Sequence, residues 1–453
     1  MTDLPRRAAL ELLTAVREED AYANLELPRI LNGHGLTGRD AAFATELAYG
    51  TLRMRGWYDA ILAHCVDRPL EKVEPVMLDI LRLGAHQLLS MRVPDHAAVD
   101  SSCGLARDHG ARPGAAARAG FVNAVLRRVA ERDDAGWEQV LRGERPDDDV
   151  EWLATRWSHP AWIVRALRSS LGDRPAELAA LLQADDIPAR PSLVARPGRM
   201  DADELLALPG VEPARWSPLG ATLVDGAPDA LACVREGRAG VQDEGSQLVA
   251  LALARAHVAD DAGRWLDMCA GPGGKAALLA GLAADAGGHL VAVEQHPHRA
   301  ALVESSLDAG SGAVVVTGDA RHEPWGDQTF DRVLVDAPCT GLGALRRRPE
   351  SRWRRTPADL AALGGIQRDL VRAALAAVRP GGVVAYVTCS PHLAETEFVI
   401  DDVLRGRDDV VLEDARALLP EIDDLGPGPT VQLWPHRHGT DGMFLAVMRR
   451  LAS

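Results

Sequence analysis

The chain has 453 residues, of which 47% are hydrophobic and 25% are charged, and its formal net charge is −15. This length exceeds what one hydrophobic core supports, so we expect several domains, and the composition excludes a mainly disordered chain. The acidic balance excludes a protein that coats nucleic acid through its overall field. Any contact with RNA must therefore come from local basic patches.

The sequence shows neither a run of about eighteen apolar residues nor the pattern of a secretory leader in its opening MTDLPRRAALELL. We therefore expect a cytoplasmic protein. Its six cysteines have no C-x-x-C spacing, which predicts free thiols and no metal site; they are Cys65, Cys103, Cys233, Cys269, Cys339 and Cys389.

From residue 4 to about 130, apolar residues recur at helical spacing, for example at Val76, Ile80 and Leu83. This pattern predicts an all-α domain, which we place at residues 1–140. The acidic stretch GERPDDD marks its boundary with a linker and a small α/β subdomain at 141–240.

After Gly240, short apolar runs alternate with helical segments such as GKAALLAGLAA. The runs are RWLDMCA, HLVAVE, AVVVTGDA, DRVLVDAP and VVAYVTCS. This alternation predicts a Rossmann-like α/β domain with a parallel sheet at residues 241–453. Because such sheets bind ligands at the carboxyl ends of their strands, the residues that close each run are the candidate site.

The first of these runs ends at Asp267 and enters a glycine-rich loop that leads into a helix, as in nucleotide-cofactor sites. The loop is not an NTP-binding P-loop, because Lys275 is followed by alanine. Glu294 closes the next strand, where a carboxylate can accept ribose hydroxyls, and Asp319 closes the third, where it can reach an adenine. Each feature alone is also compatible with an ordinary solvated loop, but together they predict a nucleoside cofactor.

Two cysteines follow the fourth and fifth strands, at Cys339 in DAPC and Cys389 in TCS. Methylation of a carbon that is not itself nucleophilic needs such a thiol. Cytosine C5 becomes enamine-like only when a thiolate adds to C6, while a nearby acid, here Asp336, hydrogen-bonds to N3 or protonates it.

Five motifs carry a family resemblance: VQDEGSQLVA, DMCAGPGGK, DAPCTGLG, TCS and DGMF. Together they resemble the Nop/Sun family of RNA cytosine-C5 methyltransferases, and the order of domains resembles its bacterial ribosomal RNA small subunit methyltransferase B group. The resemblance implies S-adenosylmethionine as cofactor and an N-terminal NusB-like RNA-binding domain, where RDAAFATELAYGTLR and FVNAVLRR stand. It also implies an RNA-contacting role for the subdomain at 141–240.

The resemblance assigns Cys389 as the nucleophile and Cys339 as the residue that assists product release, with Asp336 facing the base. It implies a cofactor site formed by Asp267, Cys269, Ala270, Gly271, Pro272, Gly273, Gly274, Lys275, Glu294, Arg299, Asp319 and Asp336. The family loop reads D-x-C-A-A-P-G-G-K-T, so this chain departs from it at Gly271 and Ala276. We expect both changes to be small.

An arginine-rich stretch follows the DAPC loop, and Arg forks bind phosphate and stack on bases. It predicts RNA contacts from Arg346, Arg347, Arg348, Arg352, Arg354 and Arg355. The alternative is a solvated charged loop.

The predicted activity is methylation of C5 of a cytidine in RNA, with 16S ribosomal RNA as the target that the resemblance implies. We expect a monomer that binds no membrane and no metal. Two alternatives remain open: a methyltransferase for a substrate with a ready lone pair, which needs no thiol, and a non-catalytic NusB-like RNA-binding protein in ribosome assembly or transcription control.

Overall fold

The computed structural model describes residues 3–109, 113–307, 309–322 and 330–452. The chain forms two compact units, one of Met1–Ile187 with Leu345–Arg354 and one of Pro188–Ala344 with Arg355–Ser453. The first unit therefore extends beyond the boundary that we placed at residue 140, and it includes a short segment from the middle of the catalytic sequence. In the described part of the chain, no helix is long and apolar enough to span a membrane.

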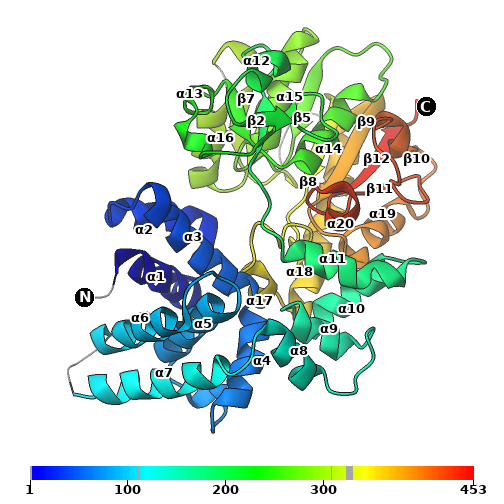
Figure 1. Cartoon of the computed structure of the whole chain (residues 1–453). Coiled ribbons are helices and arrows are strands. Elements are labelled where there is room, and N and C mark those ends of the chain that lie inside the picture. Colours follow the sequence, from blue (N-terminus) through cyan, green and yellow to red (C-terminus); the bar gives the residue numbers. More distant parts are fainter. Residues whose placement is uncertain (1–2, 110–112, 308, 323–329, 453) are drawn as a thin grey trace. The chain divides into compact units, whose positions relative to one another are not determined.

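The first unit is helical throughout its described residues (Figure 1). Its elements are α1 (Leu4–Glu18), α2 (Ala23–Gly33), α3 (Gly38–Arg53), α4 (Arg55–Cys65), η1 (Leu70–Lys72), α5 (Pro75–Leu89), α6 (Asp95–Asp108), α7 (Ala115–Val129), α8 (Asp134–Arg142), α9 (Val150–Arg156), α10 (Ala161–Ser170), η2 (Pro175–Glu177), α11 (Leu178–Asp185) and α17 (Ser351–Arg354).

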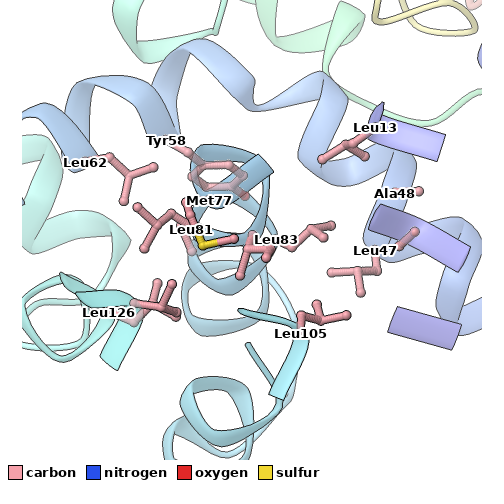
Figure 2. Packing of buried hydrophobic residues seen from close by; sticks show 14 of the residues in the cluster. Leu13, Leu47, Ala48, Tyr58, Leu62, Met77, Leu81, Leu83, Leu105 and Leu126 are labelled. Atoms are coloured by element: carbon pink, nitrogen blue, oxygen red, sulfur yellow. The ribbon is translucent and has the colours of Figure 1, made fainter. Parts of the chain in front are cut away.

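Helix α5 is the centre of this unit, because almost every residue from Met77 to Gln87 is buried. Pro75 starts the helix at a position where its missing N–H costs nothing. Figure 2 shows Leu81 and Leu83 of α5 among leucines of the surrounding helices. Each fully buried leucine contributes roughly 1.5–3 kcal/mol, so apolar packing around α5 holds the unit together.

The second unit begins with a small antiparallel sheet in the order β2-β3-β1-β4. Its elements are β1 (Ser192–Ala195), α12 (Ala202–Leu206), β2 (Val211–Pro213), β3 (Gly220–Leu223), η3 (Pro228–Ala230), α13 (Ala232–Arg235) and β4 (Ala239–Val241). Leu193, Leu205 and Cys233 form part of its own small core. This sheet occupies the predicted α/β subdomain.

A larger sheet follows, in the order β10-β12-β9-β8-β5-β6-β7, with β11 paired to β12. Its elements are α14 (Glu244–Arg255), β5 (Arg264–Asp267), α15 (Gly274–Asp285), β6 (His289–Glu294), α16 (Pro297–Ser306), η4 (Ala309–Ser311), β7 (Val314–Thr317), β8 (Phe330–Asp336), α18 (Pro357–Ala377), β9 (Val378–Thr388), η5 (Leu393–Glu395), α19 (Glu397–Leu404), β10 (Val410–Glu413), η6 (Ala415–Leu418), β11 (Val431–Gln432), α20 (Pro435–His438) and β12 (Phe444–Arg450). The five apolar runs of the sequence are β5 to β9, and these strands are parallel, as predicted. Only β12 and its partners pair antiparallel in the described sheet.

Both faces of this sheet are covered by helices. Trp265 of β5 packs in one apolar cluster with α14 and α15, whereas its neighbour Leu266 packs in another with α18 and α19. Successive side chains of a strand point to opposite faces, so a strand that alternates between two helical layers is apolar along its whole length. This explains the uninterrupted apolar runs in the sequence.

Candidate active site

Three strands end in acidic residues at one edge of the large sheet. Asp267, Glu294 and Asp336 are the last residues of β5, β6 and β8. The strand order reverses between β5 and β8, because β6 and β7 continue on one side and β9 on the other. Ligands of open α/β sheets bind at this reversal point, so the structure brings the three predicted acids to the expected place.

The glycine-rich loop connects β5 to α15, and Gly273 is the residue before the helix. Its φ is 116°, in a region that side chains disfavour, and a Cβ there would lie 2.2 Å from Ser306 Oγ. Glycine is therefore required at 273. The first N–H groups of α15, which starts at Gly274, have no partner within the helix and suit a polar ligand.

Glu294 folds back onto this loop. Its Oε2 accepts the N–H of Gly271 at 3.1 Å, and its Oε1 accepts the N–H of His296 at 2.9 Å. Arg299 donates to the carbonyl of Gly271 at 2.6 Å. A Cβ at 271 would lie 2.1 Å from Glu294 Oε2. A side chain at 271 would thus meet the Glu294 carboxylate in this structure. The expectation that the departures at Gly271 and Ala276 are small stays a prediction.

Asp267 is completely buried, and one of its oxygens has no partner. Its Oδ1 accepts the N–H of Cys269 at 3.2 Å, while Oδ2 has no hydrogen bond to any described residue. Burial, followed by the nearby charge of Asp336, raises the pKa of Asp267 to about 7. An unpaired buried acceptor costs roughly 1–3 kcal/mol. This edge therefore fits a cofactor that carries positive charge and hydrogen-bond donors, as S-adenosylmethionine does.

Cys269 lies in the same loop, but its thiol is not activated. Burial, and then the charge of Asp267, raise the pKa of its thiol well above the ordinary value. A thiol that stays protonated is a poor nucleophile. In a cofactor site, Cys269 would pack against the ligand and would not react with it.

Asp319 lies two residues after the end of β7 and is engaged by its neighbour Arg321. The guanidinium donates from Nε to Oδ1 at 2.9 Å and from Nη2 to Oδ2 at 2.5 Å. These hydrogen bonds are the main reason that the pKa of Asp319 falls to about 2. An adenine contact would have to share this carboxylate with Arg321, and that contact stays a prediction.

Lys275 links the glycine loop to the end of β8. Its Nζ donates to Asp336 Oδ2 at 2.9 Å. Burial lowers the pKa of Lys275, but the charge and hydrogen bond of Asp336 outweigh it, so the pKa is raised, and the charge of Cys389 acts in the same direction. A cation thus lies near Cys389.

The two cysteines predicted at the strand ends meet. Cys339 Sγ and Cys389 Sγ are 3.4 Å apart and share a hydrogen bond. This bond to Cys389, and then burial, raise the pKa of Cys339 well above its ordinary value. Cys339 therefore remains the protonated partner of the pair.

The two outer motifs brace the loop that follows Cys339. Asp243 Oδ1 accepts the N–H of Gly245 at 2.9 Å and that of Asp441 at 3.0 Å, which joins the VQDEGSQLVA and DGMF motifs. Gly442 then donates to the carbonyl of Gly343 at 2.7 Å. A Cβ on Gly343 would lie 2.0 Å from the Gly442 carbonyl oxygen. These motifs act on the site through the backbone.

The arginine-rich stretch corrects one prediction. Arg352 is completely buried in the helical unit, where its Nη1 donates to Asp186 at 2.8 Å and to the carbonyl of Ser158 at 3.0 Å. The prediction that Arg352 contacts RNA is therefore wrong. Arg352 of this charged stretch forms a buried ion pair. The spacing of arginines in the sequence does not predict which of them has buried acceptors.

The other arginines of the stretch differ in exposure. Arg348 is exposed, while Arg354 is largely buried with its guanidinium 5.1 Å from the Tyr22 ring centroid. Arg355 donates to the carbonyl of Thr340 at 3.2 Å, and Arg346 and Arg347 are partly exposed. RNA contacts from Arg346, Arg347, Arg348, Arg354 and Arg355 stay a prediction.

Comparison with known proteins identifies the chain. Residues 254–449 match the family model of 16S rRNA methyltransferase RsmB/F, and residues 3–131 match that of the NusB family. A putative methyltransferase of Mycobacterium tuberculosis is 52% identical, over 99% of this chain and 97% of its own length. A probable ribosomal RNA small subunit methyltransferase B of Bacillus subtilis is 31% identical over 98% of both. The chain belongs to the ribosomal RNA small subunit methyltransferase B family.

Solved structures agree on the fold. The crystal structure of PH0851 is 22% identical with a TM-score of 0.80, and the match covers 99% of this chain and 98% of that one. The predicted NusB-like helical domain and α/β methyltransferase domain are thus confirmed. The protein is an S-adenosylmethionine-dependent RNA methyltransferase of this family, which excludes the non-catalytic alternative.

One buried carboxylate beside the site, that of Glu395 in η5, has no clear signal in the sequence. Its carboxylate is completely buried beside the DAPC loop. The only signal in the sequence was its place six residues after Cys389, and a single glutamate in a polar stretch predicts a solvated residue.

Proposed function

We propose that this rRNA methyltransferase methylates C5 of a cytidine in 16S ribosomal RNA through a covalent bond between Cys389 and C6 of the base. The observation that carries the proposal is the thiol pair: Cys339 and Cys389 lie 3.4 Å apart at the ends of β8 and β9. Methyl transfer to an oxygen or amine lone pair needs no thiol, whereas C5 needs one.

The residues at the carboxyl edge would hold the cofactor. Asp267 has a buried free acceptor, Glu294 is poised over the loop, and the N-terminus of α15 presents free N–H groups. When bound, S-adenosylmethionine supplies a methyl group made electrophilic by a sulfonium. The loop residues 269–275, Arg299 and Asp319 complete the proposed site.

Cys389 is the nucleophile of the proposed reaction. Its thiolate, favoured by the nearby Lys275 cation, forms a bond to C6. In this step the Asp336 carboxyl must carry a proton, which it donates to N3 as negative charge moves there. C5 then takes the methyl group as the bond between the methyl carbon and the sulfonium breaks, which would leave S-adenosylhomocysteine. C5 next loses its proton to a base. The bond between sulfur and C6 breaks, and Cys339 donates its proton to the departing Cys389 sulfur.

The RNA must present the cytidine out of a stack, because a paired base cannot reach a thiol at the edge of a sheet. Single-stranded or looped 16S RNA fits this requirement. The exposed Arg348 and its partly exposed neighbours would contact the phosphates.

The test uses the purified full chain, radiolabelled S-adenosylmethionine and unmodified 16S RNA, with the Cys389→Ala and Cys339→Ala variants. We expect 5-methylcytidine from the wild type, no label in RNA from Cys389→Ala, and an RNA-linked protein band from Cys339→Ala on a denaturing gel. Cys233→Ala, a buried cysteine of the small sheet, is the matched control and should retain activity.

Label on another atom of the nucleoside, or full activity of Cys389→Ala, would overturn the mechanism. Label in another RNA but not in 16S RNA would overturn the substrate alone.

A further inference from the structure

Glu395 accepts two hydrogen bonds from Thr340, the residue that follows Cys339. Its Oε1 accepts the backbone N–H of Thr340 at 2.8 Å, and its Oε2 accepts the hydroxyl of the same Thr340 at 2.5 Å. The side chain of Glu395 is completely buried. Burying a carboxylate is unfavourable unless hydrogen bonds replace those it made with water. The two hydrogen bonds from Thr340 provide this compensation for Glu395.

A second side chain holds the other flank of Cys339. Gln367 of α18 donates from Nε2 to the carbonyl of Pro338 at 2.9 Å and also lies 3.3 Å from Glu395 Oε1. The residues before and after Cys339 are therefore fixed by one connected group. The Glu395 backbone is itself held, because the hydroxyl of Tyr386 donates to its carbonyl at 2.7 Å.

The same group reaches the loop of the other thiol. Thr340 Oγ1 lies 3.2 Å from the hydroxyl of Ser390, the residue after Cys389. The N–H of Gly343 donates to the carbonyl of Cys389 at 2.9 Å. Glu395, Thr340 and Ser390 thus form a chain of hydrogen bonds. This chain connects the two cysteine loops in addition to the contact between the sulfurs.

We propose that Glu395 is the positioning residue of the thiol pair, which holds Cys339 against Cys389 through Thr340. Glu395 touches neither substrate nor cofactor in this role. The consequence for turnover rests on the proposed function, whereas the effect on the thiols does not.

The charges around Cys339 are consistent with this role. The groups that act on it are Cys389 from the end of β9, Glu395 from η5 and Asp336 from the end of β8, and all raise its pKa together with burial. Tyr386 of β9 also faces Cys339 and is kept neutral by burial, with its own pKa raised. Replacing Glu395 by glutamine removes one of the contributions that raise the pKa of Cys339, alongside the hydrogen bond to Cys389 and burial, which are larger.

The first test measures thiols and needs no RNA. Glu395→Gln retains the shape of the side chain but not its charge. We expect the rate of Cys339 alkylation by iodoacetamide at pH 8.5, followed by peptide mass spectrometry, to rise about tenfold, which corresponds to one pKa unit. Glu397→Gln, an exposed glutamate two residues away, is the matched control and should alkylate as the wild type does. An unchanged Cys339 rate in folded Glu395→Gln would overturn the proposal.

A second pair of variants covers the case in which Glu395→Gln fails to fold. Thr340→Val removes the hydroxyl that joins the two loops, whereas Thr340→Ser retains it. We expect faster Cys339 alkylation in Thr340→Val and the wild-type rate in Thr340→Ser. Equal rates in these two variants would show that the hydroxyl bridge does not position the thiols.

The turnover test then separates the two proposals. We expect Glu395→Gln to lower kcat at least about tenfold, with the KM for RNA unchanged and an RNA-linked protein band that persists. If the wild type makes no 5-methylcytidine, the proposed function fails, and the alkylation result still decides the role of Glu395. If the wild type is active and Glu395→Gln releases product at the same rate, the positioning role is wrong.

Discussion

Two polar regions stand out in the sequence of this protein, and the structure places their charged groups in different surroundings. The cofactor edge, residues 267–275 with Glu294, and the arginine segment, residues 345–354, are both rich in charged or glycine residues. At the cofactor edge, Asp267 retains an acceptor without a partner among the described residues. In the arginine segment, Arg352 has its guanidinium bound by Asp186 and by backbone carbonyls.

Local sequence patterns predict the position of a group at a strand end, but they do not predict whether an arginine is buried. The groups at the cofactor edge lie on consecutive strand ends, and parallel strands bring their ends to one edge in any such sheet. The partners of Arg352 are Asp186, the residue after α11, and Ser158 in the turn before α10, both far away in the sequence. Whether a charge is solvated or buried depends on such distant partners.

The largest effect should come from Arg352→Met. Removing the guanidinium leaves Asp186 in the helical unit without its buried partner, which should cost roughly 3–5 kcal/mol of unfolding free energy. Urea unfolding followed by tryptophan fluorescence measures it, with Arg348→Met as the exposed control. Equal stability of the two variants would erase the distinction between a buried and a solvated arginine in this segment.

The next largest effect should come from Asp267→Asn, which should change how the stability of the protein depends on pH. Because burial raises the pKa of Asp267 from its ordinary value near 4 to about 7, the protonated form is favoured in the folded protein. Its contribution to stability is fully present below about pH 4 and is lost as the pH rises through 7. Asp267→Asn cannot ionise, so its melting temperature should fall less than that of the wild type between pH 5 and pH 7.5.

The same variant should bind S-adenosylmethionine about tenfold more weakly at pH 8, a loss of about 1.4 kcal/mol, because a negative charge is missing from the site. Isothermal titration calorimetry measures the affinity. Parallel melting curves and unchanged affinity would together place Asp267 among structural residues and not at the cofactor edge.

A smaller effect should come from Gly271→Ala. The new Cβ would lie 2.1 Å from Glu294 Oε2, so the carboxylate must move and lose its bond to the loop, which should cost about 1 kcal/mol. Gly274→Ala is the control, since its nearest neighbour, a carbon of Gln242, is 3.8 Å away. Thermal unfolding without cofactor compares them, and equal melting temperatures would contradict the steric argument.

The smallest effect should come from Arg348→Ala. An exposed side chain contributes within about 0.5 kcal/mol to stability. If it contacts one phosphate, the slope of log affinity for 16S RNA against log salt should decrease by about one. Filter binding at several salt concentrations measures this slope. An unchanged slope would remove Arg348 from the RNA surface and leave the segment a structural role alone.

The sequence predicted most of the fold and of the candidate site. The five apolar runs are β5 to β9, and the helical spacing around Val76 and Ile80 belongs to the buried helix α5. The sequence did not indicate that α8 to α11 lie in the same compact unit as the first seven helices, or that Glu395 is buried. Both depend on packing between segments that are distant in the chain.

The sequence motifs, through their resemblance to a known family, indicated the kind of protein. Hydrophobic periodicity predicted the helices and strands, and the reactive groups follow the strand ends. Only the tertiary structure decided how those groups interact. It brought Cys339 within 3.4 Å of Cys389, placed Glu395 behind them and buried Arg352. Side-chain distances, desolvation and pKa values depend on neighbours in space, and those neighbours are set by the packing of the whole chain.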